Sequence, residues 1–213
     1  MSANPAARGG EKAAVSGQTD CTPTLAGRRF FCSWSGGKDA YLAFARAVAA
    51  GGRPEALVCM LHEDGDRSRG HGLPVELLAA QAAALGIPLV TAATTWDDYE
   101  ATFVGVLHEL RRQDVEAGVF GDIDLEGHRV WVEEVCEVAN VSCHLPLWQE
   151  PRRRLIGELL AGGVRATVVA VDAARLDASF LGRELTAELL AAGVGAGGFE
   201  LGDELVAQLT AEE

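Results

Sequence analysis

Short apolar runs alternate with segments of helical periodicity from residue 28 onward. Between the runs, apolar residues recur every three or four positions, and glycine or arginine stands near the segment ends. Five runs have the length and apolar composition of buried strands: "RRFFCSW", "EALVCML", "IPLVTA", "AGVFGDI" and "RATVVAV". Because strands separated by helices form right-handed parallel crossovers, this order predicts an α/β fold with an open parallel sheet and helices on both faces.

The chain is expected to have three parts. Residues 1–26 are rich in Ala, Gly, Ser and Pro, which predicts a disordered tail. Residues 27–142 are expected to form the main α/β domain, and residues 143–213 a smaller C-terminal α/β region. Helices are expected at 39–52, 74–86, 97–112 and 128–139, from about Pro151, from about Arg183, and as one short helix across the apolar stripe at 201–209.

The composition argues against several classes of protein. A net charge of −13 does not suit nucleic-acid backbones, which require a basic surface. No apolar run approaches the roughly 20 residues of a membrane span, and the first 26 residues lack the apolar region of a signal peptide, so a cytoplasmic protein is expected. The five cysteines form no C-x-x-C pair, which argues against a disulfide framework or a structural zinc site.

The segment "SWSGGKDA" lies between the first expected strand and the first expected helix. Gly36 and Gly37 have no side chain, so the backbone there can turn tightly and approach a ligand closely. Their amides and the positive end of the following helix would form an anion site. Lys38 is one of two lysines against sixteen arginines, and its compact ammonium suits a phosphate. The segment therefore predicts a phosphate-binding loop.

The residues around the glycines extend this prediction. Ser33 and Ser35 can offer hydroxyls, and Asp39 can cap the helix or hold a magnesium ion. The alternative is an ordinary glycine turn with a capping aspartate and a solvated lysine. A Walker A loop is excluded, because Cys32 stands where that motif has glycine and Asp39 where it has Ser or Thr.

Asp122 allows both a functional and a structural interpretation, and two further features are interpreted as structural. Asp122 follows a strand and a glycine, where a carboxylate could bind magnesium, orient an acceptor or cap a turn. Gln81 is interpreted as a polar residue that borders the core. The basic cluster at 152–154 is interpreted as a solvated helix start. All the phosphate- and nucleotide-binding motifs are expected before residue 125.

The loop resembles the PP-loop of N-type ATP pyrophosphatases, S-G-G-K-D-S, with Ala40 in the last position. Further segments occur in the order seen in the diphthine–ammonia ligase family of PP-loop proteins: "HGLPVELLAAQAAALGIPL", "YEATFVGVLHEL", "VFGDI", "HRVWVEEVCE", "LPLW" and "FLGREL". This resemblance covers about residues 29–190. It implies a HUP-like, Rossmann-type fold that binds ATP and Mg²⁺ and cleaves ATP between the α and β phosphates. It also implies that residues 27–142 are the PP-loop nucleotide-binding domain and residues 143–213 the smaller substrate-side region.

The resemblance also implies roles for individual residues. The residues implied to bind the nucleotide are Ser33, Ser35, Gly36, Gly37, Lys38, Asp39, Met60, Leu61, His71 and Gly121. Lys38, Asp39 and Asp122 are implied to be catalytic, and the two aspartates are also the expected Mg²⁺ ligands. On the substrate side, Glu134, Trp148 and Arg183 are implied, with a solvated helix face for the glutamate and a helix start for the arginine as alternatives.

The activity implied by the resemblance is ATP-dependent amide formation, in which ammonia attacks an adenylated carboxylate. Diphthine is the acceptor in the family, but the Ala-, Gly- and Arg-rich composition is typical of a GC-rich bacterial genome, and bacteria do not need diphthamide. A different carboxylate acceptor is therefore favoured.

The C-terminal "GVGAGGFELGDE" departs from the family's G-E-N-G-E-F-H-T-like segment, which favours the alternative of a non-catalytic nucleotide-binding module or sensor. A tRNA-thiolating enzyme is disfavoured, because such enzymes use catalytic cysteines and a basic RNA surface. The oligomeric state stays open, with a homodimer as one alternative.

Overall fold

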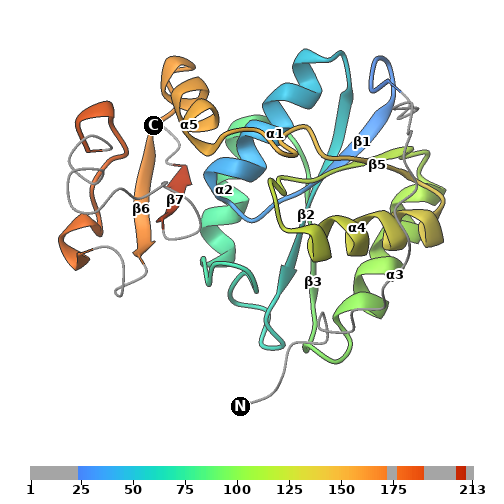
Figure 1. Ribbon diagram of the computed structural model, residues 1–213. Coiled ribbons are helices and arrows are strands. Elements are labelled where there is room, and N and C mark those ends of the chain that lie inside the picture. Colours follow the sequence, from blue (N-terminus) through green and yellow to red (C-terminus); the bar gives the residue numbers. More distant parts are fainter. Residues whose placement is uncertain (1–23, 172–176, 190–204, 210–213) are drawn as a thin grey trace.

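The computed structural model describes residues 24–171, 177–189 and 205–209 (Figure 1). The elements follow in the order β1 (Arg29–Ser33), α1 (Lys38–Ala49), β2 (Arg53–Leu61), α2 (Val75–Leu85), β3 (Leu89–Ala93), α3 (Tyr99–Arg112), β4 (Ala117–Val119), α4 (Glu126–Ala139), β5 (Ser142–His144), α5 (Arg152–Ala161), β6 (Ala166–Val171), the 3-10 helix η1 (Ala178–Phe180) and β7 (Leu205–Leu209). The alternation of strands and helices confirms the predicted α/β class.

The main sheet has five strands in the order β3-β2-β1-β4-β5, and all four pairings are parallel. The chain moves outward from β1 through β2 to β3, and then crosses to the other side of β1 for β4 and β5. The strand order therefore reverses between β1 and β4. In open α/β sheets, ligands bind beyond the carboxyl ends of the strands at such a point.

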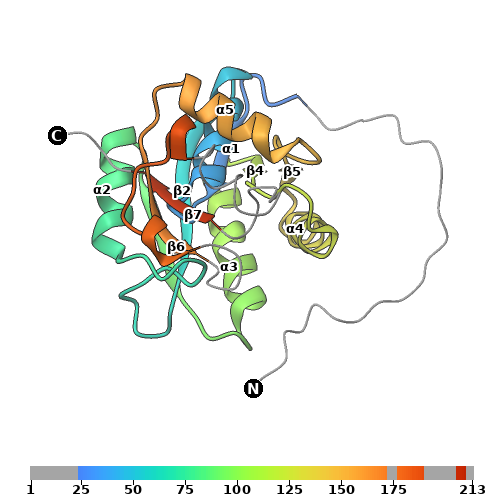
Figure 2. The same cartoon turned by 60° about the vertical axis from the view of Figure 1, so that its left-hand side comes forward.

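Side chains of the central strand alternate between two cores. Phe30 and Cys32 pack with residues of α1 and α2, whereas Phe31 packs with residues of α3 and α4. Figure 2 shows these helix pairs on opposite faces of the sheet. A strand that is buried on both faces has a continuous run of apolar residues in its sequence. This is why "RRFFCSW" could be predicted to be a strand.

The strand β5 was not expected, because three residues are too few to give a periodic pattern. It pairs with β4 through Val119 and His144, so the parallel sheet continues across residue 142, where the first domain was expected to end. At the other end, Leu25 is buried in the core although it falls within the expected tail, while residues 1–23 lie outside the described part. The domain boundaries stay predictions.

The C-terminal region forms a second, two-stranded sheet. The expected strand at 165–171 is confirmed as β6, which pairs antiparallel with β7 at 205–209. The helix expected across 201–209 is wrong within the described residues, because β7 is a strand. Its backbone pairs with the edge that β6 would otherwise expose, so tertiary context overrides the helical pattern. Helical residues after Arg183 begin at 187, and residues 190–204 lie outside the described part.

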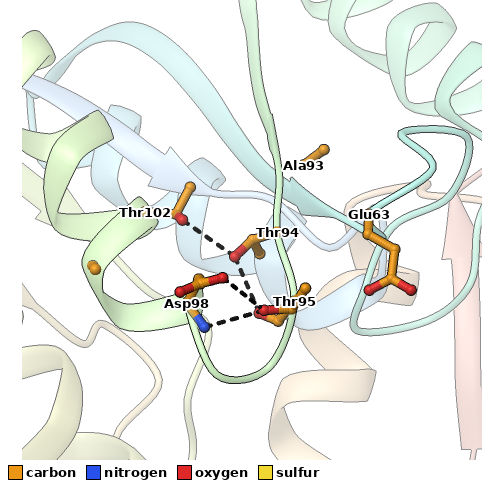
Figure 3. A pocket seen from close by; sticks show the side chains of 7 residues that line it. Glu63, Ala93, Thr94, Thr95, Asp98 and Thr102 are labelled. Atoms are coloured by element: carbon orange, nitrogen blue, oxygen red, sulfur yellow. Dashed lines mark hydrogen bonds between the residues drawn. The ribbon is translucent and has the colours of Figure 1, made fainter.

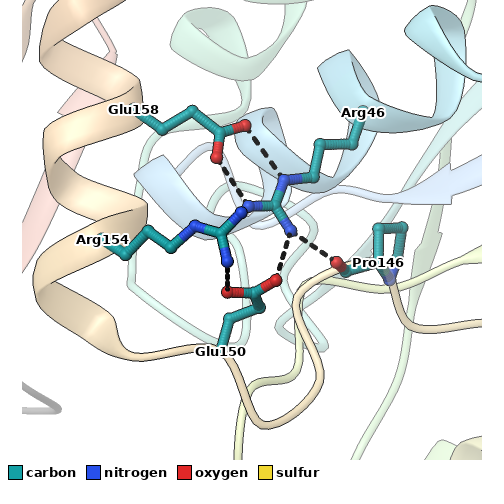
Figure 4. A network of polar contacts seen from close by, with 5 residues as sticks. All are labelled: Arg46, Pro146, Glu150, Arg154 and Glu158. Carbon is teal, nitrogen blue, oxygen red and sulfur yellow. Dashed lines mark hydrogen bonds and ion pairs between the residues drawn. The ribbon is translucent and has the colours of Figure 1, made fainter.

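A network of ion pairs attaches α5 to α1 (Figure 4). Arg46 on α1 donates two hydrogen bonds to Glu158 on α5, at 3.0 and 2.6 Å, and a third to the carbonyl oxygen of Pro146 at 2.8 Å. Glu150 lies 3.6 Å from the Arg46 guanidinium and accepts a hydrogen bond from Arg154 at 3.0 Å. The Arg46 hydrogen bonds lower the pKa of the Glu158 carboxyl. The network fixes α5 against the helix that follows the glycine loop.

We expect Phe31→Ala to reduce the free energy of unfolding by about 3–5 kcal/mol, the usual cost of removing a buried aromatic ring. Phe31 is fully buried, and the rings of Phe103 and Phe120 lie 6.4 and 5.7 Å from its ring, centroid to centroid. The control is Val138→Ala on α4, where the side chain is 62 % exposed and a change within about 0.5 kcal/mol is expected. Urea titration followed by circular dichroism measures both, and equal losses would contradict the two-core packing.

Candidate functional site

The glycine loop lies at the carboxyl end of the central strand, where the strand order reverses. The amide of Trp34 donates to the carbonyl oxygen of Val58 at 2.7 Å, which extends the β1–β2 ladder into the loop. Gly37 is the N-cap of α1 and has an extended backbone, so the helix begins at Lys38. The first amides of a helix have no intrahelical acceptor, and they give this end a partial positive charge. The loop and helix start therefore have the form of an anion site.

Gly36 has a conformation and surroundings that require glycine. Its φ of +76° lies in the left-handed region, and an added Cβ would stand 2.8 Å from methyl carbons of both Leu73 and Leu78. A side chain here would be strained by its backbone and would overlap the α2 region. The loop is therefore held tightly against the residues that precede and open α2.

The buried side-chain amide of Gln81 also holds this turn in place. The side-chain oxygen of Gln81 accepts a hydrogen bond from the Trp34 indole at 3.0 Å, and its nitrogen donates to the carbonyl oxygen of Gly36 at 3.2 Å. Gln81 is 4 % exposed, so these bonds form away from water. The sequence interpretation of Gln81 as a residue bordering the core missed this role; the available signal was a polar side chain on the apolar face of a helix.

Lys38 is not a solvated side chain. Its exposed fraction is 12 %, and its ammonium donates to a carboxylate oxygen of Asp39 at 2.8 Å. A lysine is seldom this well buried without a partner. The alternative of an ordinary turn with a solvated lysine therefore does not describe this loop.

The backbone of the loop after β4 lies against the start of α1. A Cβ added to Gly121 would lie 2.9 Å from both the amide nitrogen of Ala40 and the carbonyl carbon of Asp39, so this glycine backbone rests against the first turn of α1. The next residue, Asp122, has a side chain that is 22 % exposed and lies 3.2 Å from a ring nitrogen of His128. Asp122 thus follows a glycine whose backbone contacts the backbone of Asp39.

The two serines of the loop differ in their contacts. The Ser35 hydroxyl oxygen accepts a hydrogen bond from the amide of Gly37 at 3.3 Å, which leaves its proton available to a ligand. Ser33 is the last residue of β1 and is half-buried. Both lie within the loop region that the sequence indicated.

Met60 and Leu61 end β2 one strand away from the loop, and their side chains are buried in the two cores. Their carbonyl oxygens accept hydrogen bonds from the amides of Arg69, at 2.8 Å, and Thr94, at 3.2 Å. A ligand would therefore meet backbone atoms at these positions, and not side chains.

His71 lies in the loop between β2 and α2, close enough to Lys38 for the ammonium to influence it. Partial burial of the ring, followed by the Lys38 charge, lowers the pKa of His71 from its ordinary value. Asp39 acts in the opposite direction. The downward shift of the pKa favours the neutral ring, which can accept as well as donate a hydrogen bond.

The three expected substrate-side residues lie on separate elements. Glu134 is exposed on α4, and Trp148 is half-buried with the Arg129 guanidinium 5.6 Å from its ring. Arg183 is exposed, and its guanidinium lies 5.7 Å from the ring of Phe180 in its own segment. These contacts do not gather the three residues at the glycine loop, and their substrate roles stay predictions.

An open cavity of about 500 Å³ lies at the carboxyl ends of β2 and β3 (Figure 3). Its walls combine two carboxylates, three threonine hydroxyls and two alanine methyls, contributed by Glu63, Ala93, Thr94, Thr95, Asp98, Ala101 and Thr102. The Thr94 hydroxyl donates a hydrogen bond to the carbonyl oxygen of Thr95 and lies near the Thr102 hydroxyl. The Thr95 hydroxyl donates to the Asp98 carboxylate and accepts from the Asp98 amide. This cavity could not be predicted from the sequence, because the residues that line it do not form a recognisable sequence motif.

Arg69 reinforces the wall of this cavity. Its guanidinium donates to the carbonyl oxygen of Thr94 and lies 4.8 Å from the ring of Trp96. The side chain is 5 % exposed, and its Nε is buried without a hydrogen-bond partner. The positive charge is partly offset by Glu63, 3.9 Å away.

Comparison with known protein families identifies the first part of the chain. Residues 28–142, more than half of the chain, match the model of the diphthamide synthase N-terminal domain. The chain belongs to the diphthamide synthase N-terminal domain family. This confirms the resemblance noted in the sequence, and it makes the five-stranded part a PP-loop domain of an ATP-utilising type. A comparison with curated proteins found no match.

The match to the diphthamide synthase N-terminal domain includes the SGGKD loop, Gln81, Gly121 and Asp122. Trp148, α5 and Arg183 follow the matched residues. Among the described residues, no helix is long and apolar enough to cross a membrane.

We expect Gly36→Ala to destabilise the protein more than Gly65→Ala does. Gly65 has a nearly equal φ of +78° but open space around it, so alanine there carries only the left-handed strain of about 1–2 kcal/mol. At Gly36 the contacts with Leu73 and Leu78 add about 1–3 kcal/mol of overpacking. Urea unfolding of both variants isolates the steric part, and equal losses would contradict the tight seating of the loop.

Proposed function

We propose that this chain binds ATP on the SGGKD loop and transfers the AMP moiety to an acceptor carboxylate, which ammonia then converts to an amide. A carboxylate oxygen attacks the α-phosphorus, and the bond to the bridging oxygen breaks to release pyrophosphate. Ammonia next attacks the carbonyl carbon, and AMP leaves with its electron pair while the nitrogen loses a proton. The observation that carries the proposal is the mostly buried Lys38 on a braced glycine loop at the strand-order reversal.

Lys38 and the loop amides stabilise the charge that develops on the departing pyrophosphate. Donors that are fixed before the reaction need no reorganisation, and they act most strongly where water is excluded. Gly36 is held by Gln81 and by Leu73 and Leu78, which supports such pre-organisation. The Lys38 ammonium exchanges its contact with Asp39 for phosphate oxygens when ATP binds.

Asp39 and Asp122 are the residues that would hold Mg²⁺. Mg²⁺ prefers oxygen ligands and is usually bound by one or two carboxylates together with substrate phosphates. The backbone contact of Gly121 with the first turn of α1 supports this proposal, because it brings the loop that carries Asp122 next to the turn that carries Asp39. Within the described residues there is no group of three or more acidic, His or Cys side chains that would form a complete protein site. When bound there, Mg²⁺ neutralises phosphate charge and polarises the phosphoryl oxygens.

The adenosine part of ATP extends along the end of β2 toward the cavity beside β3. Met60 and Leu61 would meet the ligand with backbone atoms. The carbonyl oxygen of Leu61 accepts a hydrogen bond from the amide of Thr94, which lies in the cavity wall. The carboxylates of Glu63 and Asp98 can accept hydrogen bonds from an amino group or from ribose hydroxyls. The Lys38 charge acts on His71, which supports a place for this histidine near the phosphate end of the proposed nucleotide.

The alternative function is a nucleotide-binding module without transfer chemistry. It is favoured by the C-terminal segment "GVGAGGFELGDE" at 193–204, which departs from the family's G-E-N-G-E-F-H-T-like segment and lies outside the described residues. Both functions require ATP on the loop, so they differ in products and not in binding.

We expect Lys38→Ala to weaken ATP binding by roughly 10- to 150-fold, because loss of a hydrogen bond to a charged group costs about 1.5–3 kcal/mol. Isothermal titration calorimetry measures the change, and the matched control is Lys12→Ala at the other lysine. Circular dichroism verifies the fold of both variants. Unchanged affinity of the Lys38 variant would exclude the phosphate assignment.

We expect AMP and pyrophosphate, and not ADP and orthophosphate, when the protein is incubated with ATP, Mg²⁺, ammonium and a panel of carboxylic acids. The loop lacks the Walker Ser or Thr that binds magnesium at the β–γ bridge. Ion-exchange chromatography separates the products. ADP with orthophosphate would refute cleavage between the α and β phosphates, while ATP binding without any product would favour the non-catalytic module.

A further inference from the structure

A second cation lies beside the phosphate loop, and it comes from α5. A small cavity of about 10 Å³ separates the start of α1 from the start of α5. Its lining joins the two helices to the loop after β4 through Lys38, Asp39, Ile123, Arg152, Leu155 and Ile156. The side chain of Arg152 is 18 % exposed, so this arginine is not part of a solvated helix start as the sequence analysis favoured.

Arg152 is held in place by a carboxylate. Its Nη2 and Nε donate to the two oxygens of Asp124, at 2.7 and 3.2 Å. Asp124 follows Asp122 by two residues, so the pair spans the β4–α4 loop and the first turn of α5. This side-by-side geometry is also the one in which a guanidinium binds phosphate.

The neighbouring arginines have different surroundings. Arg153 is exposed, and Arg154 is 67 % exposed and bonds to Glu150. Among the three consecutive arginines, Arg152 is the one that lines the cavity next to Lys38. Successive side chains on a helix point about 100° apart. When Arg152 faces the cavity, Arg153 and Arg154 therefore point in other directions.

The position of Arg152 depends on how α5 packs against the rest of the protein. Leu155 and Ile156, one turn later on α5, are buried, and Arg46 ties Glu158 to α1. Lys38 and Arg152 therefore form a pair of cations that line one cavity, each with its own aspartate. The aspartates offset the mutual repulsion of the cations until an anion replaces them.

We propose that Arg152 is a second phosphate-binding residue, which exchanges its contact with Asp124 for oxygens of the pyrophosphate portion of the bound nucleoside triphosphate. The inference rests on the proposed function, because it assumes that the loop binds polyphosphate. It adds that the binding site does not end with the five-stranded domain: α5, beyond residue 142, supplies one of its charges.

The test compares four single substitutions by calorimetric titration with inorganic pyrophosphate and with ATP. We expect Arg152→Ala to weaken both affinities about tenfold or more, the scale of one charge-assisted contact, and the neighbouring Arg153→Ala to change them by less than about twofold. Lys38→Ala reports on the loop itself. Thermal unfolding shows whether each variant is folded.

The fourth variant, Asp124→Asn, separates phosphate binding from a structural role. It removes the charge of the Arg152 partner but keeps the guanidinium, so pyrophosphate affinity should be retained or increased. If Asp124→Asn loses affinity as Arg152→Ala does, the ion pair is structural and the inference is overturned.

The outcomes also separate the inference from the proposed function. If the unmodified protein binds neither ATP nor pyrophosphate, the proposed function fails, and the inference fails with it. If it binds both, and Lys38→Ala weakens binding while Arg152→Ala behaves as Arg153→Ala does, the inference alone is overturned.

Discussion

The central strand β1 constrains the rest of the structure. It forms ladders with β2 on one edge and β4 on the other, and Phe30 and Phe31 are fully buried on its opposite faces. Such a strand cannot shift by one residue without exchanging its side chains between the two cores. The point at which β1 ends is therefore fixed, and so is the start of the SGGKD loop. The open end of α1 depends on this anchoring.

The buried amide of Gln81 extends the anchoring into the loop itself. It satisfies the Trp34 indole and the Gly36 carbonyl at once, and removing it would leave both polar groups buried without this partner, at about 1–3 kcal/mol each. A loop that is held by such bonds keeps its amides in one arrangement before a ligand arrives. The rigid part of the site is thus built from α2, a helix that carries none of the residues expected to contact the nucleotide.

The parts that the sequence predicted are those with local signals. The SGGKD loop is a contiguous motif between a strand and a helix, and Asp122 follows a strand and a glycine. The roles of Gln81 and Arg152 depend instead on which face of a helix meets the loop, and this is decided by packing between distant segments. The short β5 has no periodicity to detect, and β7 is a strand because β6 lies beside it, although its apolar spacing also fits a helix.

The Arg46 network has a thermodynamic consequence for communication between the two parts of the chain. Since Arg46 holds Glu158, Glu150 and the Pro146 carbonyl together, a displacement of α5 strains the helix that begins at Lys38. A ligand that prefers one position of α5 would thereby change the affinity of the loop for its anion. Linkage makes this effect reciprocal, so the anion would change the affinity for that ligand by the same factor.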